Sequence, residues 1–243
     1  MRQFGLIGYP LGHSFSKKYF SEKFIKEGIA NTGYENYPIA DISEFPSVLA
    51  TPGLEGLNVT IPYKEQVMAF LDEQSEGVKA IGACNCIHIT DGKKIGYNTD
   101  AFGFRQSFQP LLQPHHRQAL VLGTGGAAKA VQYVLTQLNI GYKIVSRNAV
   151  ANGFTYDELT PALLQQYTII INTTPLGTFP HTETAPDIPY QALSEQHYLY
   201  DLVYNPPLTR FLALGKEQGA ATKNGADMLV LQAEESWRIW NRK

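Results

Sequence analysis

A glycine-rich loop in the middle of the chain constrains the fold more than any other feature. The apolar run 119–122 breaks at Gly123, further glycines follow at Gly125 and Gly126, and small, helix-favouring residues continue to Ala130. This order is typical of a strand, a tight turn and a helix, whose free N–H groups and dipole favour an anion at its start. We expect a dinucleotide pyrophosphate here, with an ordinary strand-to-helix turn as the alternative.

The segment Tyr142–Arg147 has the pattern of the second strand of a βαβ unit, because it follows the loop after one helix length. An acid at the end of this strand would hydrogen-bond a ribose 2′-hydroxyl, as for NAD, whereas an arginine suits the 2′-phosphate of NADP. Ser146, Arg147 and Asn148 stand at this end and include no acid. The pattern favours NADP, and the alternative for Arg147 is a solvated surface charge.

The charge balance argues against nucleic acid or a membrane surface as a partner. Charged residues make up 17% of the 243 residues and the net charge is −2, so no basic face is expected. No apolar run reaches the roughly 20 residues that cross a bilayer, and the first residues enter a strand without the apolar region of a signal peptide. We expect a cytoplasmic protein that acts on small molecules, built as one large domain or two modest ones.

The two cysteines lie close together in the sequence. A strand over 83–89 would point Cys84 and Cys86 to the same face. A zinc site would need more ligands than these cysteines and His88 provide. We therefore expect two small core residues and no metal.

Alternating strand-like and helix-like segments predict an α/β fold with a domain boundary near 100–117. Strands are expected over 3–9, 34–39, 54–60, 83–89, 94–100, 119–122, 142–147, 167–172 and 197–204. Helices are expected over 42–49, 63–71, 102–112 and 228–240, and another begins after an N-cap at Ser16. The continuous apolar runs of the second half indicate a parallel sheet covered on both faces.

Polar residues gather in several turns of the first half, mostly where a predicted strand ends. These positions form the ligand crevice of open α/β sheets, and hydroxyl, amide and ammonium groups together suit a polyol or a hydroxy acid. The clusters are 13–16, 58–64, Asn85 and 98–100. Taken singly, these residues can also be explained without a ligand. Turn or cap roles suit Ser14 and Ser16, hydrogen bonds to local backbone suit Asn58 and Asn98, and a solvated charge suits Lys64. Their joint occurrence favours a binding site.

These clusters and the glycine loop carry a resemblance to a known family. The N-terminal motifs are GYPLGHSFS at 8–16, GLNVTIPYK at 56–64, GACN at 82–85 and GYNTD at 96–100. The C-terminal motifs are GTGGAA at 123–128, NTTPLG at 172–177, DLVYNP at 201–206 and NGADMLVLQ at 224–232. In their order and approximate spacing the chain resembles shikimate dehydrogenase.

The resemblance implies an enzyme with an N-terminal α/β substrate domain and an NADP-binding Rossmann domain with a parallel sheet. The substrate domain would span 1–100, joined by the C-terminal helix 226–243, and the Rossmann domain would span 101–225. The implied activity is NADPH-dependent reduction of 3-dehydroshikimate to shikimate in aromatic amino-acid (chorismate) biosynthesis. A monomer or homodimer is expected.

The resemblance also implies roles for individual residues. Lys64 and Asp100 would form the catalytic pair. The substrate would be bound by Ser14, Ser16, Asn58, Thr60, Asn85 and Gln232. The cofactor would be bound by Gly123, Gly125, Gly126, Ala127, Ser146, Arg147, Thr173, Tyr204, Gly225 and Met228.

The chain departs from the family pattern at a few places, and three alternatives stay open. Lys17 stands where the family has proline, Cys86 replaces a threonine, and the short link 148–167 leaves little room for the usual helix.

The alternatives are a quinate and shikimate dehydrogenase of dual specificity, a nucleotide-sensing regulator that lost turnover, and a Rossmann methyltransferase. The last is disfavoured by Arg147 and by the missing acid at the strand end.

Overall fold

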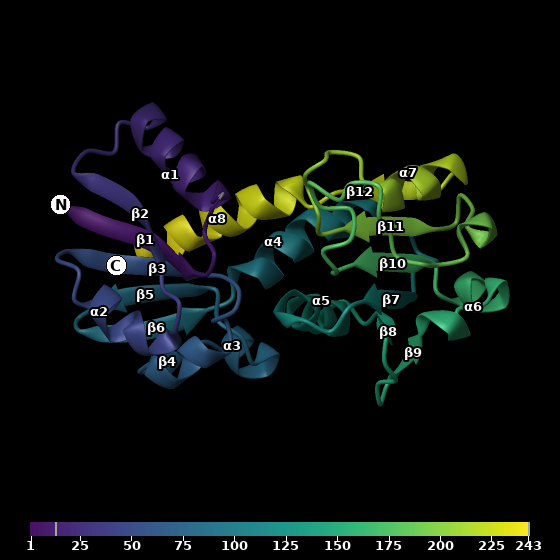
Figure 1. The fold of residues 1–243 in the computed structure, drawn as a ribbon, viewed down its shortest axis with the longest axis horizontal. Helices are drawn as coiled ribbons and strands as arrows, with labels where there is room; N and C mark the ends of the chain where they lie inside the picture. Colours follow the sequence, from purple (N-terminus) through teal and green to yellow (C-terminus); the bar gives the residue numbers. More distant parts are fainter. Residues whose placement is uncertain (13, 243) are drawn as a thin grey trace. The chain divides into compact units, whose positions relative to one another are not determined.

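The computed structural model describes residues 1–12 and 14–242, so His13 of the first polar turn lies outside the described residues. The chain divides into two compact units. One comprises Met1–Thr99 with Ala233–Lys243, and the other comprises Asp100–Gln232. Each unit has its own sheet with helices packed against it (Figure 1), which confirms the predicted α/β class.

The described part of the first unit contains a mixed sheet of six strands in the order β2-β1-β3-β5-β6-β4. The strands are β1 (Arg2–Gly8), β2 (Thr32–Pro38), β3 (Leu54–Val59), β4 (Glu73–Gln74), β5 (Cys86–Thr90) and β6 (Lys93–Tyr97). The helices are α1 (Phe15–Lys26), the 3₁₀ turn η1 (Ile42–Glu44), α2 (Phe45–Leu49), the 3₁₀ helix η2 (Gln66–Phe70) and α3 (Glu76–Ile81). Strands β1, β2 and β3 run parallel, and β5 and β6 form an antiparallel hairpin whose turn places Asp91 and Gly92 at positive φ.

Apolar side chains alternate between the two faces of this sheet, and each face has a core. One core contains Ile7, Phe45, Leu57, Val67, Cys84 and Ile87. The other contains Phe4, Phe20, Phe24, Tyr34, Cys86, Ile239 and Trp240. The second core is mostly aromatic: Phe20 stacks on Tyr34 with 4.7 Å between ring centroids, and Phe4 stacks on Trp240 at 4.8 Å.

Two expectations for local structure in this unit are wrong. Helix α1 is capped by Ser14, not Ser16, because Ser14 has an extended backbone and its Oγ accepts from the N–H of Lys17, whereas Ser16 already lies in the helix. The expected helix over 63–71 is a turn followed by the 3₁₀ helix η2, since apolar residues at Val67 and Phe70 match the three-residue period of 3₁₀ structure as well as an α-helix.

The expectation that both cysteines share one face is also wrong, although both are fully buried, free thiols as predicted. Cys84 packs in one core and Cys86 in the other. The reason is that strand β5 begins only at Cys86, so the two-residue alternation of a strand does not extend back to Cys84.

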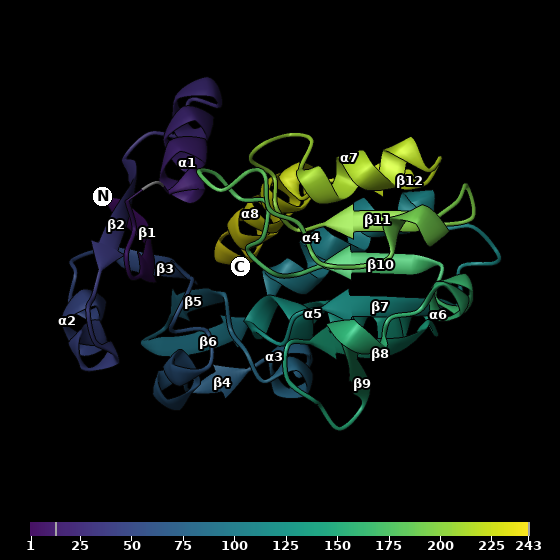
Figure 2. The ribbon, with the colours of Figure 1, turned by 45° about the vertical axis from the view of Figure 1, so that its right-hand side comes forward.

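The second unit has a parallel sheet in the order β12-β11-β10-β7-β8-β9. Its strands are β7 (Gln118–Leu122), β8 (Gly141–Ser146), β9 (Gly153–Thr155), β10 (Ile169–Asn172), β11 (Tyr198–Asp201) and β12 (Ala221–Lys223). Figure 2 shows β11, β10, β7 and β8 lying side by side in this order. Numbered from β7, the order is 3-2-1-4-5-6, which is the doubly wound arrangement of dinucleotide-binding domains.

Helices and 3₁₀ turns precede, connect and follow these strands. They are α4 (Thr99–Phe108), η3 (Gln109–Leu111), α5 (Gly126–Gln137), η4 (Tyr156–Glu158), α6 (Pro161–Gln166), η5 (Tyr190–Ala192), α7 (Arg210–Glu217) and α8 (Ala226–Trp240). The residues of β10 and β11 are all buried, as their continuous apolar runs predicted. The short link after Asn148 has room for β9, η4 and the six-residue helix α6.

Helix α8 contributes residues to both units, since the division falls between Gln232 and Ala233. In the first unit, the indole Nε1 of Trp240 donates to the carbonyl of Ile87 at 2.9 Å, and its ring covers Gly56 so closely that a Cβ there would overlap it. Among the helices of residues 1–12 and 14–242, none is long and apolar enough to cross a bilayer.

Candidate functional site

A buried polar network in the first unit joins three of the predicted substrate-binding residues. The Tyr34 hydroxyl donates to Asn58 Oδ1 at 2.8 Å. Burial raises the pKa of Tyr34, and a hydrogen bond with Ser16 partly opposes this effect. Asn58 is only 4% exposed, and its Nδ2 donates to Ser236 Oγ at 3.0 Å. The network thus runs from α1 through β2 and β3 to α8.

The same network continues to Asn85. Asn58 Nδ2 also lies 3.3 Å from the Asn85 carbonyl oxygen. The Asn85 side chain is 3% exposed; its Oδ1 accepts from the N–H of Thr99 at 2.6 Å and its Nδ2 lies 3.0 Å from Thr99 Oγ1. Thr99 Oγ1 is in turn 3.1 Å from Ser236 Oγ. The two amides are therefore held rigidly. Thr99 belongs to the polar cluster 98–100, whereas Tyr34 and Ser236 are members that the sequence did not reveal.

The remaining residues predicted in the first unit lie at the ends of elements. Ser14 precedes α1 and Thr60 follows β3, where its N–H donates to the Ile7 carbonyl at 2.9 Å. Lys64 is half-buried in the turn before η2, and its carbonyl accepts from the N–H of Cys84 at 2.8 Å. The structure thus fixes the Lys64 backbone next to the segment that carries Asn85.

Asp100 and Gln232 belong to the second unit. Asp100 is half-buried in the first turn of α4, and Gln232 on α8 is 7% exposed, with its Nε2 donating to the Leu229 carbonyl at 2.9 Å. Asn98 of the polar cluster 98–100 links two segments of the first unit, because its Nδ2 donates to the Ala83 carbonyl at 2.9 Å.

The glycine loop lies where the strand order of the second sheet reverses, between β7 and β10. Gly123 has a φ of 113°, in the region that favours glycine, and a Cβ there would lie 2.6 Å from Thr173 Oγ1. That hydroxyl donates to the Leu122 carbonyl at 2.6 Å. Gly123 and Thr173, both predicted to bind the cofactor, therefore meet at the ligand-binding edge of the sheet.

Helix α5 begins at Gly126, and its N-cap residue Gly125 provides no side-chain hydrogen bond to the first turn. Gly125 is exposed, and a Cβ added there would meet no atom within 4 Å. The N–H groups of the first turn, including that of Ala127, point out of the helix start, where its dipole favours negative charge. These features fit a pyrophosphate.

The end of β8 presents the residues expected at the ribose. Ser146 is the last residue of the strand, and its Oγ accepts from the N–H of Asn148 at 3.4 Å. Arg147 is exposed. It lies near Tyr156 of η4, whose pKa is raised by burial and lowered to a smaller extent by the Arg147 charge. A guanidinium at this edge can pair with a phosphate.

Three predicted cofactor-binding residues surround the end of β11 and the start of α8. Tyr204 is 40% exposed in the loop after β11. Gly225 is packed so tightly against the Leu202 carbonyl that a Cβ would overlap it, and its N–H donates to the Val203 carbonyl at 3.3 Å. Met228 is buried one turn further along α8.

A buried carboxyl that the sequence did not single out fixes this end of the sheet. Asp201 ends β11 and is fully buried. Its Oδ1 accepts from Asn172 Nδ2 at 2.9 Å and from the N–H of Val203 at 3.0 Å, and its Oδ2 accepts from Thr209 Oγ1 at 2.5 Å. Burial outweighs these hydrogen bonds and raises the Asp201 pKa to about 6.

Known proteins resemble the chain over nearly its whole length. Residues 6–87 match the family model described as the shikimate dehydrogenase substrate binding domain. The shikimate dehydrogenase (NADP(+)) of Methanococcus maripaludis strain C6 is 36% identical over an alignment that covers 98% of this chain and 91% of that protein.

Solved structures show the same fold. Shikimate 5-dehydrogenase from Thermus thermophilus, crystallised with NADP(H) and shikimate, has a TM-score of 0.87 at 28% identity, covering 99% of this chain and 94% of that one. The ligand-free 5-ketofructose reductase of Gluconobacter sp. strain CHM43 has a TM-score of 0.84 at 27% identity, covering 99% and 92%. The identity to curated relatives over almost the full chain shows that this protein belongs to the shikimate dehydrogenase family.

Proposed function

We propose that this chain is an NADP-dependent shikimate dehydrogenase, an oxidoreductase that interconverts 3-dehydroshikimate and shikimate in aromatic amino-acid biosynthesis. The observation that carries the proposal is the 36% identity, over 98% of the chain, to an enzyme named for this activity. The doubly wound sheet with an uncapped glycine turn at β7 supports a dinucleotide.

The residues of the second unit fit NADP. The N–H groups of the first turn of α5 would receive the pyrophosphate, the Arg147 guanidinium would pair with the 2′-phosphate, and Tyr204, Gly225 and Met228 would line the nicotinamide side. When bound, the reduced cofactor supplies the hydride for a carbonyl carbon. The chain's own residues would bind the cofactor and the substrate, and would donate or accept the proton.

The residues of the first unit fit a hydroxylated carboxylic acid. The hydroxyls of Ser14 and Ser16 would hold the carboxylate, and Asn58, Thr60 and Asn85 would bind the ring hydroxyls. Gln232 of α8 would complete this set. Because the two asparagines are fixed by the buried network, they present their remaining polar groups without a further loss of conformational entropy.

Lys64 and Asp100 are proposed as the catalytic pair. Reduction of a carbonyl leaves negative charge on its oxygen, which the Lys64 ammonium can stabilise before it gives that oxygen a proton. The Asp100 carboxylate would position Lys64 and could exchange a proton with it. In the direction of oxidation the same groups remove the hydroxyl proton.

A second candidate is reduction of a different polyol ketone. It is favoured by the likeness to 5-ketofructose reductase, which has a TM-score of 0.84 and 27% identity to this chain. A dehydrogenase that accepts quinate beside shikimate belongs to the same candidate class. A cytoplasmic location, the absence of a nucleic-acid partner and a monomeric or homodimeric state also remain part of the proposal.

Initial-rate kinetics with purified protein test the proposal. Shikimate and quinate are each paired with NADP⁺ and NAD⁺, and 5-ketofructose is tested with NADPH. We expect the highest kcat/KM for shikimate with NADP⁺. A higher value for 5-ketofructose would support the second candidate, and NADP⁺ binding without turnover of any substrate would indicate a regulator.

A further inference from the structure

We propose that Asn224 is a positioning residue that holds the Tyr204 loop, residues 202–209, against the start of helix α8. The inference rests on the proposed function, because Tyr204 on the loop and Gly225 and Met228 beside it are the residues proposed for the nicotinamide side. Asn224 itself is outside the predicted site.

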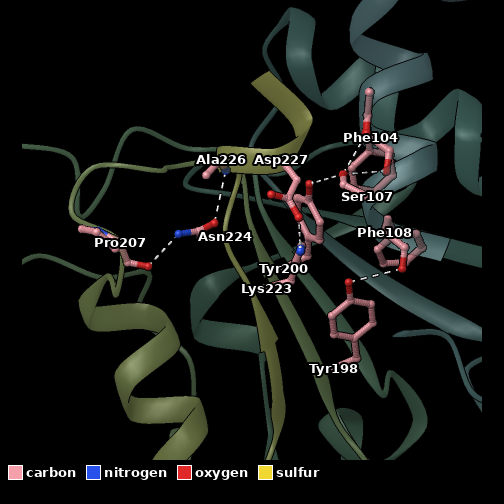
Figure 3. Close-up of polar contacts among 11 residues, drawn as sticks. Phe104, Ser107, Phe108, Tyr198, Tyr200, Pro207, Lys223, Asn224, Ala226 and Asp227 are labelled. Atoms are coloured by element: carbon pink, nitrogen blue, oxygen red, sulfur yellow. Dashed lines mark hydrogen bonds and ion pairs between the residues drawn. The ribbon is translucent and has the colours of Figure 1, made fainter. Parts of the chain in front are cut away.

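The Asn224 side chain makes two different hydrogen bonds (Figure 3). Its Nδ2 donates to the Pro207 carbonyl at 2.7 Å, and its Oδ1 accepts from the N–H of Ala226 at 3.2 Å. The second bond is an Asx turn, in which the asparagine side chain accepts from the backbone N–H two residues further on, here that of the first residue of α8. The first bond is unrelated to the helix and reaches across to the loop.

The middle of the Tyr204 loop lies at the surface of the unit. Tyr204, Asn205, Pro207 and Leu208 are all exposed. The ends of the loop are held by Asp201, which accepts from the N–H of Val203 and from Thr209 Oγ1. Between these ends, the Asn224 side chain holds the Pro207 carbonyl, and the N–H of Phe179 donates to the Asn205 carbonyl at 3.1 Å. Asn224 therefore restrains the exposed stretch at a point that the buried ends do not reach.

The surroundings of Asn224 keep its own backbone in place. Lys223 forms an ion pair with Asp227 across the same turn (Figure 3). The N–H of Gly225 donates to the Val203 carbonyl at 3.3 Å. On the adjacent strand, the Tyr200 hydroxyl is 2.6 Å from Ser107 Oγ on α4. A substitution at Asn224 that keeps the hydrogen bond from the N–H of Ala226 should therefore change the loop rather than the start of α8.

The two hydrogen bonds can be separated by substitution. In both Asn224→Asp and Asn224→Ser, a side-chain oxygen can still accept from the N–H of Ala226. The contact to the Pro207 carbonyl is lost in both, because an ionised carboxylate has no donor and the serine hydroxyl ends one bond short of the asparagine Nδ2. The aspartate adds a negative charge and the serine does not, so an effect common to both variants reports the lost donor.

The test compares two ligands by isothermal titration calorimetry. NADP⁺ would contact both the residues proposed for its 2′-phosphate and those proposed for its nicotinamide. Adenosine 2′,5′-bisphosphate lacks the nicotinamide, the ribose attached to it and one phosphate of the pyrophosphate. Loss of one neutral hydrogen bond should weaken NADP⁺ binding by about three- to ten-fold in both variants, while the Kd of the bisphosphate stays within about two-fold. We also expect kcat for shikimate oxidation to fall while KM for shikimate stays unchanged.

Thr160→Ala provides a matched control, since it removes the N-cap of α6, whose Oγ1 accepts from the N–H of Leu163. This variant should unfold at a lower temperature without a change in either Kd. Parallel weakening of both ligands by the Asn224 variants would show a general structural role and overturn the proposal, as would unchanged NADP⁺ binding. Failure of the unsubstituted protein to bind NADP⁺ would instead refute the proposed function.

Discussion

Replacement of Asp201 by asparagine should make the protein more stable at neutral pH. In the folded chain this carboxyl is fully buried, and its three hydrogen-bond donors are the neutral groups of Asn172, Val203 and Thr209. Burial raises the Asp201 pKa from 3.8 to about 6, so the ionised form is disfavoured in the folded state relative to the unfolded state.

The direction and size of the change in the free energy of unfolding follow from this pKa shift. A carboxyl with a raised pKa binds its proton more tightly in the folded state, so stability is lost as pH rises through the window from 3.8 to about 6. A shift of this size corresponds to about 3 kcal/mol above the window. In Asp201→Asn, Oδ1 keeps its donors while the Thr209 hydroxyl loses its acceptor, at a pH-independent cost of about 1 kcal/mol. The variant should therefore be about 2 kcal/mol more stable than the unsubstituted protein at pH 8. The constant cost cancels in the pH dependence, so this difference should grow by about 2.4 kcal/mol between pH 4 and pH 8.

Urea unfolding followed by far-UV circular dichroism at several pH values measures this difference. Thr209→Val serves as a counterpart, because it removes a donor but leaves the carboxyl, so the folded-state pKa of Asp201 should rise further and the total loss of stability with rising pH should become larger and extend to higher pH. The reasoning would be refuted if the free energies of unfolding of Asp201→Asn and of the unsubstituted protein differed by the same amount at every pH from 4 to 8.

Three further predictions concern the proposed site and its support. Lys64→Ala should lower kcat about 10²- to 10⁴-fold with unchanged NADP⁺ affinity by calorimetry, and near-normal turnover would remove Lys64 from the mechanism. Arg147→Ala should raise the KM for NADP⁺ much more than the KM for NAD⁺, and equal increases would contradict pairing with the 2′-phosphate. Gly103→Ala would place a Cβ 2.6 Å from the Met228 carbonyl oxygen and should destabilise the fold by about 1–3 kcal/mol in urea unfolding. Gly77→Ala, where a Cβ meets nothing within 4 Å, is its control and should be neutral or stabilising.

The second unit could be predicted from the sequence because its signals are local. The residues 169–171 are three consecutive isoleucines, as expected for a strand buried on both faces, and the turn at Gly123 has a positive φ that few residues other than glycine adopt. The topology then follows from the handedness and neighbour rules of βαβ units. The local prediction was wrong where one spacing of apolar residues suits two structures. A helix was expected over 63–71, and the structure has the 3₁₀ helix η2 there.

The candidate site in the first unit was predictable only in part. Its residues stood out as polar groups at strand ends, and Ser16, Asn58 and Asn85 do share one network. The partner Ser236 is 178 residues from Asn58, and a contact at this separation depends on tertiary packing that no local pattern encodes. The burial of Asp201 was not predicted for the same reason, because it depends on packing against Asn172 of β10 and Thr209 at the start of α7.

The division of helix α8 between the two units affects how the chain folds during synthesis. All residues of the second unit, 100–232, are synthesised before residue 233. The first unit is begun earlier, yet its aromatic core includes Ile239 and Trp240, which emerge after all of the second unit. Domains generally fold as units in the order of synthesis. Here the unit that is started first should be the last to complete its core, and until then the face of its sheet around Phe4 stays exposed.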